Sequence, residues 1–282
     1  MKKRYAHVVI VTDCGGSDRG RYEIALHRCF YPHDHHLSFF ETESMNTLHA
    51  GFTAAAHALS SIDHFGPLRN AEQTGVIVNA APRHGNENGR KLRGASRNPQ
   101  GEEIYALRLK NDVWVVGPNA GYNFYFLRGQ VVESFLVTDM SGRYTPFRSM
   151  EVMVPVLAKI FGIQKFPHLK LKPQALSVPT VERCVVVADS DSHGNIYLAS
   201  TMPHDVWMPP LGESNAFMIG NQIARPRHVD GIFAGETGEQ TLTRGSLTLN
   251  GEPVYYIVIV GSNAHRSLGS PPVGTKVEIE QE

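Results

Sequence analysis

The sequence predicts an α/β N-terminal domain with a mixed central sheet, followed by a smaller all-β C-terminal domain of the sandwich or barrel type. Continuous β-branched runs alternate with helical patterns in the first half of the chain, whereas short strand patterns dominate beyond about residue 180. At 282 residues the chain also exceeds the length at which a single core is usual. Two domains are therefore expected.

The first element is predicted to be a buried strand that leads into a polar loop. Residues 8–12 are β-branched throughout, and residues 13–18 are mostly polar and include two adjacent glycines. A helix is expected to begin near Asp18, because Tyr22, Leu26 and Cys29 recur at helical spacing.

A second helix and a second buried strand follow. Ser44 can cap this helix, whose apolar stripe comprises Leu48, Phe52, Ala55, Ala56 and Leu59. Residues 75–82 then form an apolar run that ends in a loop. The polar, glycine-containing stretch 83–101 is expected to be a long exposed insertion.

A hairpin pattern completes the sheet of the first domain. Strand patterns at 104–109 and 113–116 are joined by Lys110-Asn111-Asp112, which favours a tight turn. An antiparallel hairpin beside strands that are joined through helices predicts a mixed sheet. A last helix is expected over 149–160, where Val152, Val156 and Ile160 share one face.

The domain boundary is placed at a stretch rich in proline and lysine. The first domain is expected to span 1–165, with a linker at 166–180 and the second domain at 181–282. Seven short strand patterns follow the linker, at 184–188, 195–199, 217–219, 231–234, 246–249, 255–260 and 276–279.

Composition narrows the class of partner. Lys plus Arg and Asp plus Glu both number 27, so no net charge is available to hold a nucleic acid or an anionic membrane, and a small-molecule partner is expected. Three cysteines without C-x-x-C spacing favour a reducing, cytoplasmic location over a disulfide framework. The apolar run at 8–11 is too short for a signal sequence or a membrane span.

Three other patterns favour structural interpretations over chemical ones. His33, His35 and His36 match no standard zinc spacing, so a surface loop before a strand is expected there and no metal site. Cys14 has no evident base partner and is interpreted as a small buried residue. The arginines and lysine between 83 and 97 lack interleaved aromatic residues, which favours a solvated loop over a phosphate or RNA site.

Polar residues follow the predicted strands of the first domain. Asp13, Asn79 and Asn119 each lie where a strand runs into a loop. In α/β domains ligands bind beyond the carboxyl ends of strands, so these residues are site candidates. Capping of the turns is an equally open interpretation.

Five motifs in this order resemble a known family. They are Thr12-Asp13-Cys14-Gly15-Gly16-Ser17-Asp18, Val116-Gly117-Pro118-Asn119-Ala120-Gly121, Phe147-Arg148-Ser149-Met150-Glu151 with Pro155 following, Asp191-Ser192-His193-Gly194-Asn195, and Ser262-Asn263-Ala264. Across nearly its whole length the chain resembles the family of S-adenosylmethionine (SAM) hydroxide adenosyltransferases and SAM halogenases, such as fluorinase and chlorinase.

The resemblance implies cleavage of SAM at its C5′ carbon. Water or a small anion would attack, releasing methionine and adenosine or a 5′-substituted adenosine, so SAM is the substrate and no cofactor is implied. Asp13 would accept the ribose hydroxyls. The substrate-binding residues implied are Asp13, Ser17, Asp18, Asn119, Asp191, His193, Asn195, Tyr197, Asn263 and Ala264. A homotrimer with the site between subunits is also implied.

The chain departs from the family where water or halide would be activated. The Asp, His and Arg of hydroxide-using members fall on Ala81, Arg148 and Met150. Ser149 matches a halogenase serine, but the aromatic residues that enclose the halide fall on Ala81 and about Met45. The catalytic candidates that remain are Ser149, Arg148, His84 and Glu151, with Arg83 as a further polar group in the same loop.

These departures leave two alternatives open. One is a catalytically silent homologue that binds SAM or adenosine and has lost the chemistry. The other is an intramolecular, lyase-type cleavage of SAM, which would yield homoserine lactone and methylthioadenosine.

Overall fold

The structure is a computed structural model that divides into two compact units, Met1–Pro179 and Thr180–Glu282. Each unit has its own buried core. The residues that the structure describes are 5–42, 47–63, 73–81, 86–87, 90–91, 102–141, 147–179, 184–188, 194–199, 207–231, 239–244, 248–249, 252–253, 255–260, 264–272 and 274–280.

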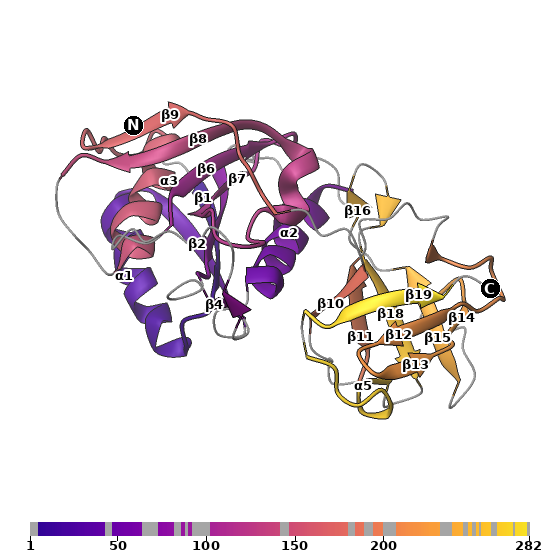
Figure 1. Cartoon of the computed structure of the whole chain (residues 1–282). Helices are drawn as coiled ribbons and strands as arrows, with labels where there is room; N and C mark the ends of the chain where they lie inside the picture. The colour runs from indigo at the N-terminus through magenta and orange to yellow at the C-terminus, as the bar shows by residue number, and fades with distance from the viewer. Residues whose placement is uncertain are drawn as a thin grey trace. The chain divides into compact units, whose positions relative to one another are not determined.

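A seven-stranded mixed sheet forms the centre of the described part of the first unit, in the order β2-β1-β3-β7-β6-β8-β9 (Figure 1). β1 lies parallel to β2 and β3, and β3 lies parallel to β7, whereas β6, β8 and β9 continue the sheet antiparallel. The predicted mixed sheet is confirmed. The strands are β1 (Tyr5–Thr12), β2 (Asp34–Glu41), β3 (Thr74–Asn79), β6 (Ile104–Leu109), β7 (Trp114–Pro118), β8 (Val131–Asp139) and β9 (Leu169–Pro173).

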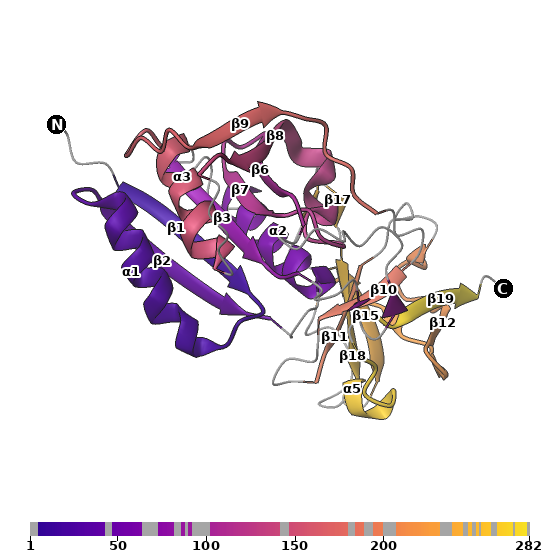
Figure 2. The same cartoon turned by 60° about the vertical axis from the view of Figure 1, so that its left-hand side comes forward.

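Helices cover both faces of this sheet (Figures 1 and 2). On one face α1 packs beside α3, with the rings of Phe30 and Phe161 6.2 Å apart. On the other face α2 packs beside η4, with the rings of Phe52 and Phe126 5.9 Å apart. These helical segments are α1 (Arg19–Phe30), α2 (Thr47–Asp63), the 3-10 helix η4 (Tyr125–Gln130), the π-helix η5 (Ser149–Met153) and α3 (Val154–Ile160).

The chain changes direction across the sheet at β1. From β1 it passes through α1 to β2 on one side, and from β2 it passes through α2 to β3 on the other side of β1. This is a topological switch point, and open α/β sheets bind ligands beyond the carboxyl ends of the strands at such a point. The loops after β1 and β3 therefore occupy the position at which such folds bind ligands.

Two glycines permit the close packing on which this arrangement depends. A Cβ atom on Gly51 of α2 would lie 2.2 Å from the Tyr122 carbonyl oxygen, so no larger residue fits without backbone movement. A Cβ atom on Gly75 of β3 would lie 2.8 Å from the Leu157 side chain of α3. Gly75 therefore lets α3 approach the sheet, and Gly51 lets α2 approach the turn at Tyr122.

Three segments differ from the sequence-based expectations. The predicted surface loop of histidines is instead the start of β2, which begins at Asp34, and His33 is buried. β8 had no counterpart among the predicted strands. β9 lies inside the predicted linker of 166–180 and pairs with β8 from Phe135 to Asp139. Exposed Lys170 and Lys172 made β9 resemble a linker, although lysine on an edge strand is a common way to prevent further strand pairing.

An eight-stranded sheet dominates the described part of the second unit, in the order β13-β12-β19-β10-β11-β18-β15-β14. Its core includes Trp207, Phe217 and Leu198. The predicted strand at 231–234 lies, except for Gly231, outside the described residues. The strands are β10 (Cys184–Ala188), β11 (Ile196–Ala199), β12 (Ala216–Ile219), β13 (Gln222–Ala224), β14 (Arg227–His228), β15 (Gln240–Arg244), β18 (Tyr255–Val260) and β19 (Lys276–Glu280).

Smaller elements accompany both sheets. In the first unit β4 (Asn86–Glu87) pairs with β5 (Arg90–Lys91), and in the second β16 (Thr248–Leu249) pairs with β17 (Glu252–Pro253). The short helix α5 (Ala264–Ser267) precedes β19. Within the described ranges, no helix combines the length and the apolar character needed to cross a membrane.

Candidate functional site

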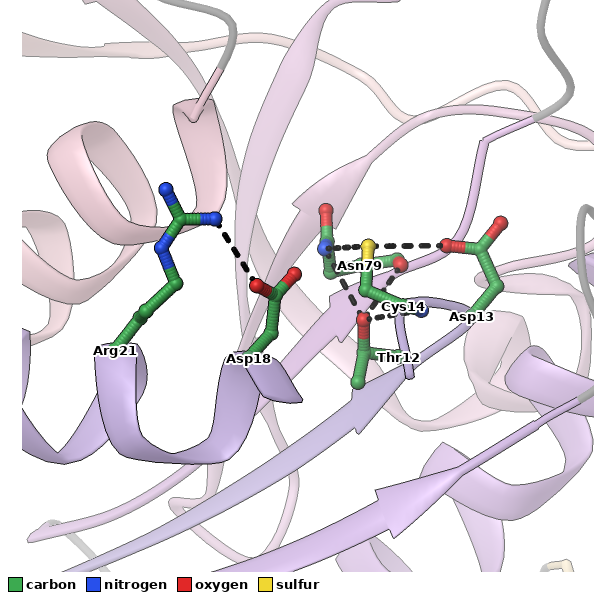
Figure 3. Close-up of polar contacts among 6 residues, drawn as sticks. All are labelled: Thr12, Asp13, Cys14, Asp18, Arg21 and Asn79. Carbon is green, nitrogen blue, oxygen red and sulfur yellow. Dashed lines mark hydrogen bonds and ion pairs between the residues drawn. The ribbon is translucent and has the colours of Figure 1, made fainter. Parts of the chain in front are cut away.

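The loop after β1 is tied to the end of β3 through the Thr12 hydroxyl. The Thr12 Oγ1 atom accepts hydrogen bonds from the Asn79 side-chain amide and from the Cys14 backbone N–H, both at 3.1 Å (Figure 3). The Asp13 backbone N–H also donates to the Asn79 carbonyl oxygen at 3.3 Å. These bonds fix the direction in which the loop leaves the sheet, at the switch point between β1 and β3.

Asp13 lies at the start of this loop and is half-buried. Its carboxylate Oδ1 atom lies 3.8 Å from the Cys14 Sγ atom, which also receives the Asn79 amide at 3.6 Å. The loop folds back onto the strand end, and Asp13 is neither fully buried nor fully exposed. A carboxylate in this position can accept hydrogen bonds from a ligand.

The pKa of the Cys14 thiol is raised by burial and by nearby carboxylates. Burial raises its pKa, the hydrogen bond with Thr12 opposes that rise, and the carboxylates of Asp13 and Asp18 raise it further. The thiol is therefore protonated at neutral pH, which makes it a poor nucleophile, in line with the structural interpretation. The same two carboxylates favour a positively charged ligand beside the loop.

A third carboxylate lies against the loop. A Cβ atom on Gly16 would lie 2.8 Å from the Glu41 Oε1 atom at the end of β2, which places that carboxylate beside Gly16. Asp18 pairs with Arg21 at 3.1 Å (Figure 3). Arg19 pairs with Glu23 at 3.2 Å on the helix. Glu41 was missed in the sequence, because it is the last residue of a strand, β2, whose position in the sheet was not predicted.

The exposed stretch Gly15-Gly16-Ser17 gives the loop its open surface. A 3-10 turn, η1 (Gly16–Asp18), leads directly into α1, and the Asp18 backbone N–H donates to the Gly15 carbonyl oxygen at 2.9 Å. Ser17 is exposed on this turn. Of the predicted binding residues, the structure thus brings Asp13, Ser17 and Asp18 together in one loop.

Asn119 is hydrogen-bonded to two carbonyl oxygens of the first unit. Its side-chain amide donates to the Ser177 carbonyl oxygen at 3.0 Å, and its backbone N–H donates to the Glu103 carbonyl oxygen at 2.7 Å. The amide group is therefore used to anchor the chain after β9 to the end of β7. A partner 58 residues away in sequence could not be inferred from the motif.

Asn123 is the asparagine that connects the loops after β3 and β7. It is fully buried, and its amide donates to the Ala80 carbonyl oxygen at 2.7 Å and to the Pro118 carbonyl oxygen at 3.0 Å. Its Oδ1 atom makes no hydrogen bond to any residue that the structure describes. The only sequence signal for Asn123 was a second asparagine shortly after the glycine of the Asn119 motif.

The three catalytic candidates of the third motif, Ser149, Arg148 and Glu151, differ in how deeply they are buried. Ser149 is buried at the start of the π-helix η5, which packs against α1, β3 and β7. Single π-turns of this kind occur frequently at functional sites. Arg148 is half-buried, whereas Glu151 is exposed.

Glu151 lines a surface cavity of about 300 Å³ between α1 and the chain around Phe147. The Arg21 guanidinium, which also lines this cavity, lies 4.3 Å from the centre of the Phe147 ring while it pairs with Asp18. Arg21 thus links the loop after β1 to the third motif. Met150 lies in the same cavity wall, as well as against the core.

In the second unit, two of the predicted motifs meet. The His265 backbone N–H donates to the Gly194 carbonyl oxygen at 2.9 Å, which joins the start of α5 to the residue before Asn195. Asn195 and Ala264 are both buried, and Tyr197 is half-buried on β11. Gly194 has φ of +77°, which favours glycine at that turn.

Four predicted site residues, His84, Asp191, His193 and Asn263, lie outside the described residues. Across the described ranges, no group of three His, Cys, Asp or Glu side chains is arranged to hold a metal ion. The histidines near the start of β2 instead make ring contacts, His35 with Phe30 and His36 with His7.

Comparisons with known proteins show the fold alone. An uncharacterized conserved protein from Thermotoga maritima superposes with a TM-score of 0.65 at 18% identity, covering 97% of this chain and 100% of its own. A conserved hypothetical protein from Thermus thermophilus superposes with a TM-score of 0.58 at 14% identity, covering 98% of this chain and 100% of its own. No family model and no curated protein matches the sequence.

Proposed function

We propose that this protein binds SAM at the loop after β1 and cleaves it at C5′, with water or a small anion as the nucleophile. The observation that carries the proposal is the set of three carboxylates, from Asp13, Asp18 and Glu41, around an open loop at the switch point of the sheet. SAM carries a sulfonium cation, and a site of negative potential attracts it. The order of the five sequence motifs supports the same ligand.

Asp13 holds the ribose in this proposal. Its two carboxylate oxygens can accept hydrogen bonds from the 2′ and 3′ hydroxyls of a nucleoside at the same time. The backbone beside it is fixed by the bonds of Thr12 and Asn79, so the carboxylate is positioned before the ligand arrives. Such prior positioning reduces the entropy that binding must overcome.

The reaction is a substitution at carbon. The nucleophile forms a bond to C5′ while the bond between C5′ and sulfur breaks, and sulfur takes the electron pair and becomes the neutral thioether of methionine. With water as the nucleophile, the oxygen then loses a proton to solvent and the nucleoside product is adenosine. No electron acceptor or cofactor is required, since the sulfonium is itself the leaving group.

The third motif provides the groups nearest the reacting atoms. Ser149 contributes its hydroxyl from the start of η5, and Arg148 and Glu151 are the charged residues beside it. A β-rich second domain contributes Asn195, Tyr197 and Ala264 to recognition of the adenine and methionine portions.

The proposed assembly is a cytoplasmic homotrimer with the site between subunits, and a monomer in light scattering at micromolar concentration would contradict that assembly.

A second candidate is a silent homologue that binds SAM or adenosine without turnover. It is favoured by Ala81, Arg148 and Met150, which occupy the positions of the water-activating residues in the family that the chain resembles. It is also favoured by the Cys14 thiol, whose raised pKa removes it as a replacement nucleophile.

Product analysis separates these functions. Purified protein is incubated with SAM, alone and with chloride, fluoride or azide, and the products are resolved by chromatography. Adenosine or a 5′-substituted adenosine, formed together with methionine, supports the proposal, whereas homoserine lactone with methylthioadenosine indicates the lyase reaction. Calorimetric binding of SAM or adenosine without any product supports the silent homologue, and the absence of both binding and product contradicts the proposal and the silent homologue.

A further inference from the structure

The hydroxyl group of Tyr22 is buried and lacks a hydrogen-bond partner among the described residues. The residue is on α1 and is fully buried, and its ring packs against Phe39 of β2 at 5.9 Å. Its hydroxyl oxygen makes no hydrogen bond of acceptable geometry within the described part of the chain. Buried polar groups in native proteins are nearly always hydrogen-bonded, so this exception requires an explanation.

The surroundings of the hydroxyl connect it to the candidate site. Burial raises the pKa of the Tyr22 phenol, and the Ser149 and Thr12 hydroxyls oppose the rise, whereas Cys14 and Asp18 add to it. The groups that act on the phenol thus come from the loop after β1 and from the start of η5. The Tyr22 hydroxyl therefore lies near both the loop after β1 and the start of η5.

Phenylalanine at this position would provide the same packing without an unpaired hydroxyl. The helical spacing of Tyr22 on α1 accounts for its buried ring but not for its oxygen. A small polar molecule bound beside the Ser149 hydroxyl would give the Tyr22 hydroxyl a partner of good geometry. The nearby hydroxyl of Ser149 is also buried, so the two can contact the same atom of such a molecule.

We propose that the Tyr22 hydroxyl donates a hydrogen bond to the water oxygen that attacks C5′ and, with the Ser149 hydroxyl, holds that oxygen in line with the bond that breaks. This inference rests on the proposed cleavage of SAM. The nucleophile then lies on the interior side of the loop after β1, beside the hydroxyls of Tyr22 and Ser149.

The phenol acts as a donor and keeps its proton throughout. Its raised pKa leaves it neutral over the physiological range, so it does not serve as a general base. The proton lost by the attacking water passes to solvent after the C–O bond forms, and Tyr22 ends the reaction as it began. A neutral water molecule also suits a position near the Asp18 carboxylate better than an anion does.

The test is Tyr22→Phe, which removes a single oxygen atom. Turnover of SAM at saturating concentration is expected to fall by about 10- to 100-fold, because one preorganised donor to the reacting atoms is lost. The dissociation constant for adenosine is expected to stay within about twofold, since the ribose contacts remain. The melting temperature is expected to stay the same or rise, because an unpaired buried hydroxyl is replaced by hydrogen.

Tyr31→Phe is the matched control, because Tyr31 follows the same helix and its side chain is exposed. Turnover by this variant should equal that of the unmodified protein. A Tyr22→Phe variant that turns over SAM within twofold of the unmodified protein overturns the inference and leaves the proposed function standing. A fall in melting temperature together with a weaker adenosine affinity shows a purely structural role and also overturns it. An unmodified protein without turnover refutes the proposed function, and with it this inference.

Discussion

The Asn79 side-chain amide donates a hydrogen bond to the Thr12 hydroxyl at 3.1 Å, and this bond joins the ends of the two strands between which the candidate site lies. Thr12 is fully buried and also accepts from the Cys14 backbone N–H. One hydroxyl therefore satisfies two donors and sets the path of the loop that carries Asp13.

Replacement of Thr12 by valine should destabilise the protein. Valine keeps the shape of threonine but leaves the Cys14 backbone N–H and the Asn79 amide without their acceptor, which should lower the free energy of unfolding by about 1–3 kcal/mol. Urea denaturation measures the change. Ser17→Ala is the control, because Ser17 is exposed and its removal should leave stability unaltered. Equal stability of the Thr12→Val variant and the unmodified protein would show that water accepts the hydrogen bonds from Cys14 and Asn79 as well as the threonine hydroxyl does.

Two glycine-to-alanine changes should act in opposite directions. Gly51→Ala places a methyl group 2.2 Å from the Tyr122 carbonyl oxygen and should destabilise by at least about 1–3 kcal/mol. In α1, a Cβ atom on Gly20 would meet nothing within 4 Å, so Gly20→Ala should stabilise by about 0.5–1 kcal/mol. Thermal denaturation of the two variants measures both effects. A Gly51→Ala variant that melts with the unmodified protein would contradict the close approach of α2 to residue 122.

Stability should fall as the pH drops below about 6.5, the ordinary pKa of histidine in an unfolded chain. Burial lowers the pKa of His57, with His7 adding to it, and burial lowers the pKa of His7, with His36 adding to it. The folded state therefore holds these imidazoles neutral while the unfolded chain takes up protons. The stabilisation that comes from these neutral histidines is intact above that pH. It is lost as the pH falls from the pKa of the unfolded chain toward the lower pKa values of the folded state.

Denaturation in urea at several pH values from about 7.5 to 5 checks this dependence, a range chosen to bracket the histidine pKa. His57 stacks on Phe40 with ring centres 3.8 Å apart, so His57→Gln should cost some stability at neutral pH while reducing the slope below about pH 6.5. A slope in the variant as steep as in the unmodified protein would assign the loss to other groups.

Much of the first domain could be predicted from local sequence patterns, whereas strands that pair with distant segments could not. β1, α1 and the hairpin of β6 and β7 have continuous apolar or turn signals, and the structure has them as expected. β8 and β9 escaped prediction because each has only one fully buried residue, so neither contains a buried run. Their pairing joins residues that lie 30 to 38 positions apart in sequence, which no local pattern shows.

The candidate site, too, was predictable from the sequence only where its residues are close together along the chain. Asp13, Ser17 and Asp18 lie in one short loop, so the sequence could group them. Glu41 and Asn123 reach the site only through the order of strands in the sheet, and Asn119 is occupied by a carbonyl group far along the chain. Tyr22 was noted only for its helical spacing, because spacing reveals which face of a helix is buried and not where a hydroxyl points.

Asp13→Asn should weaken adenosine binding without destabilising the fold. The amide keeps the size of the carboxylate but loses its charge and half its acceptor capacity, which should cost about 1.5–3 kcal/mol in binding free energy. Calorimetry and thermal denaturation on the same variant measure the two quantities. A clear loss of melting temperature with an unaltered dissociation constant would assign Asp13 to a capping role and would remove it from the ligand site.

Cleavage of SAM in water enriched in heavy oxygen tests the central claim most directly. Mass spectrometry of the nucleoside product reports whether solvent oxygen has become bonded to C5′, and comparison with an incubation lacking protein removes spontaneous decay. We expect adenosine that carries the heavy oxygen, formed in equal amount with methionine. Intact SAM after hours of incubation, whether or not calorimetry detects its binding, would contradict the proposed cleavage.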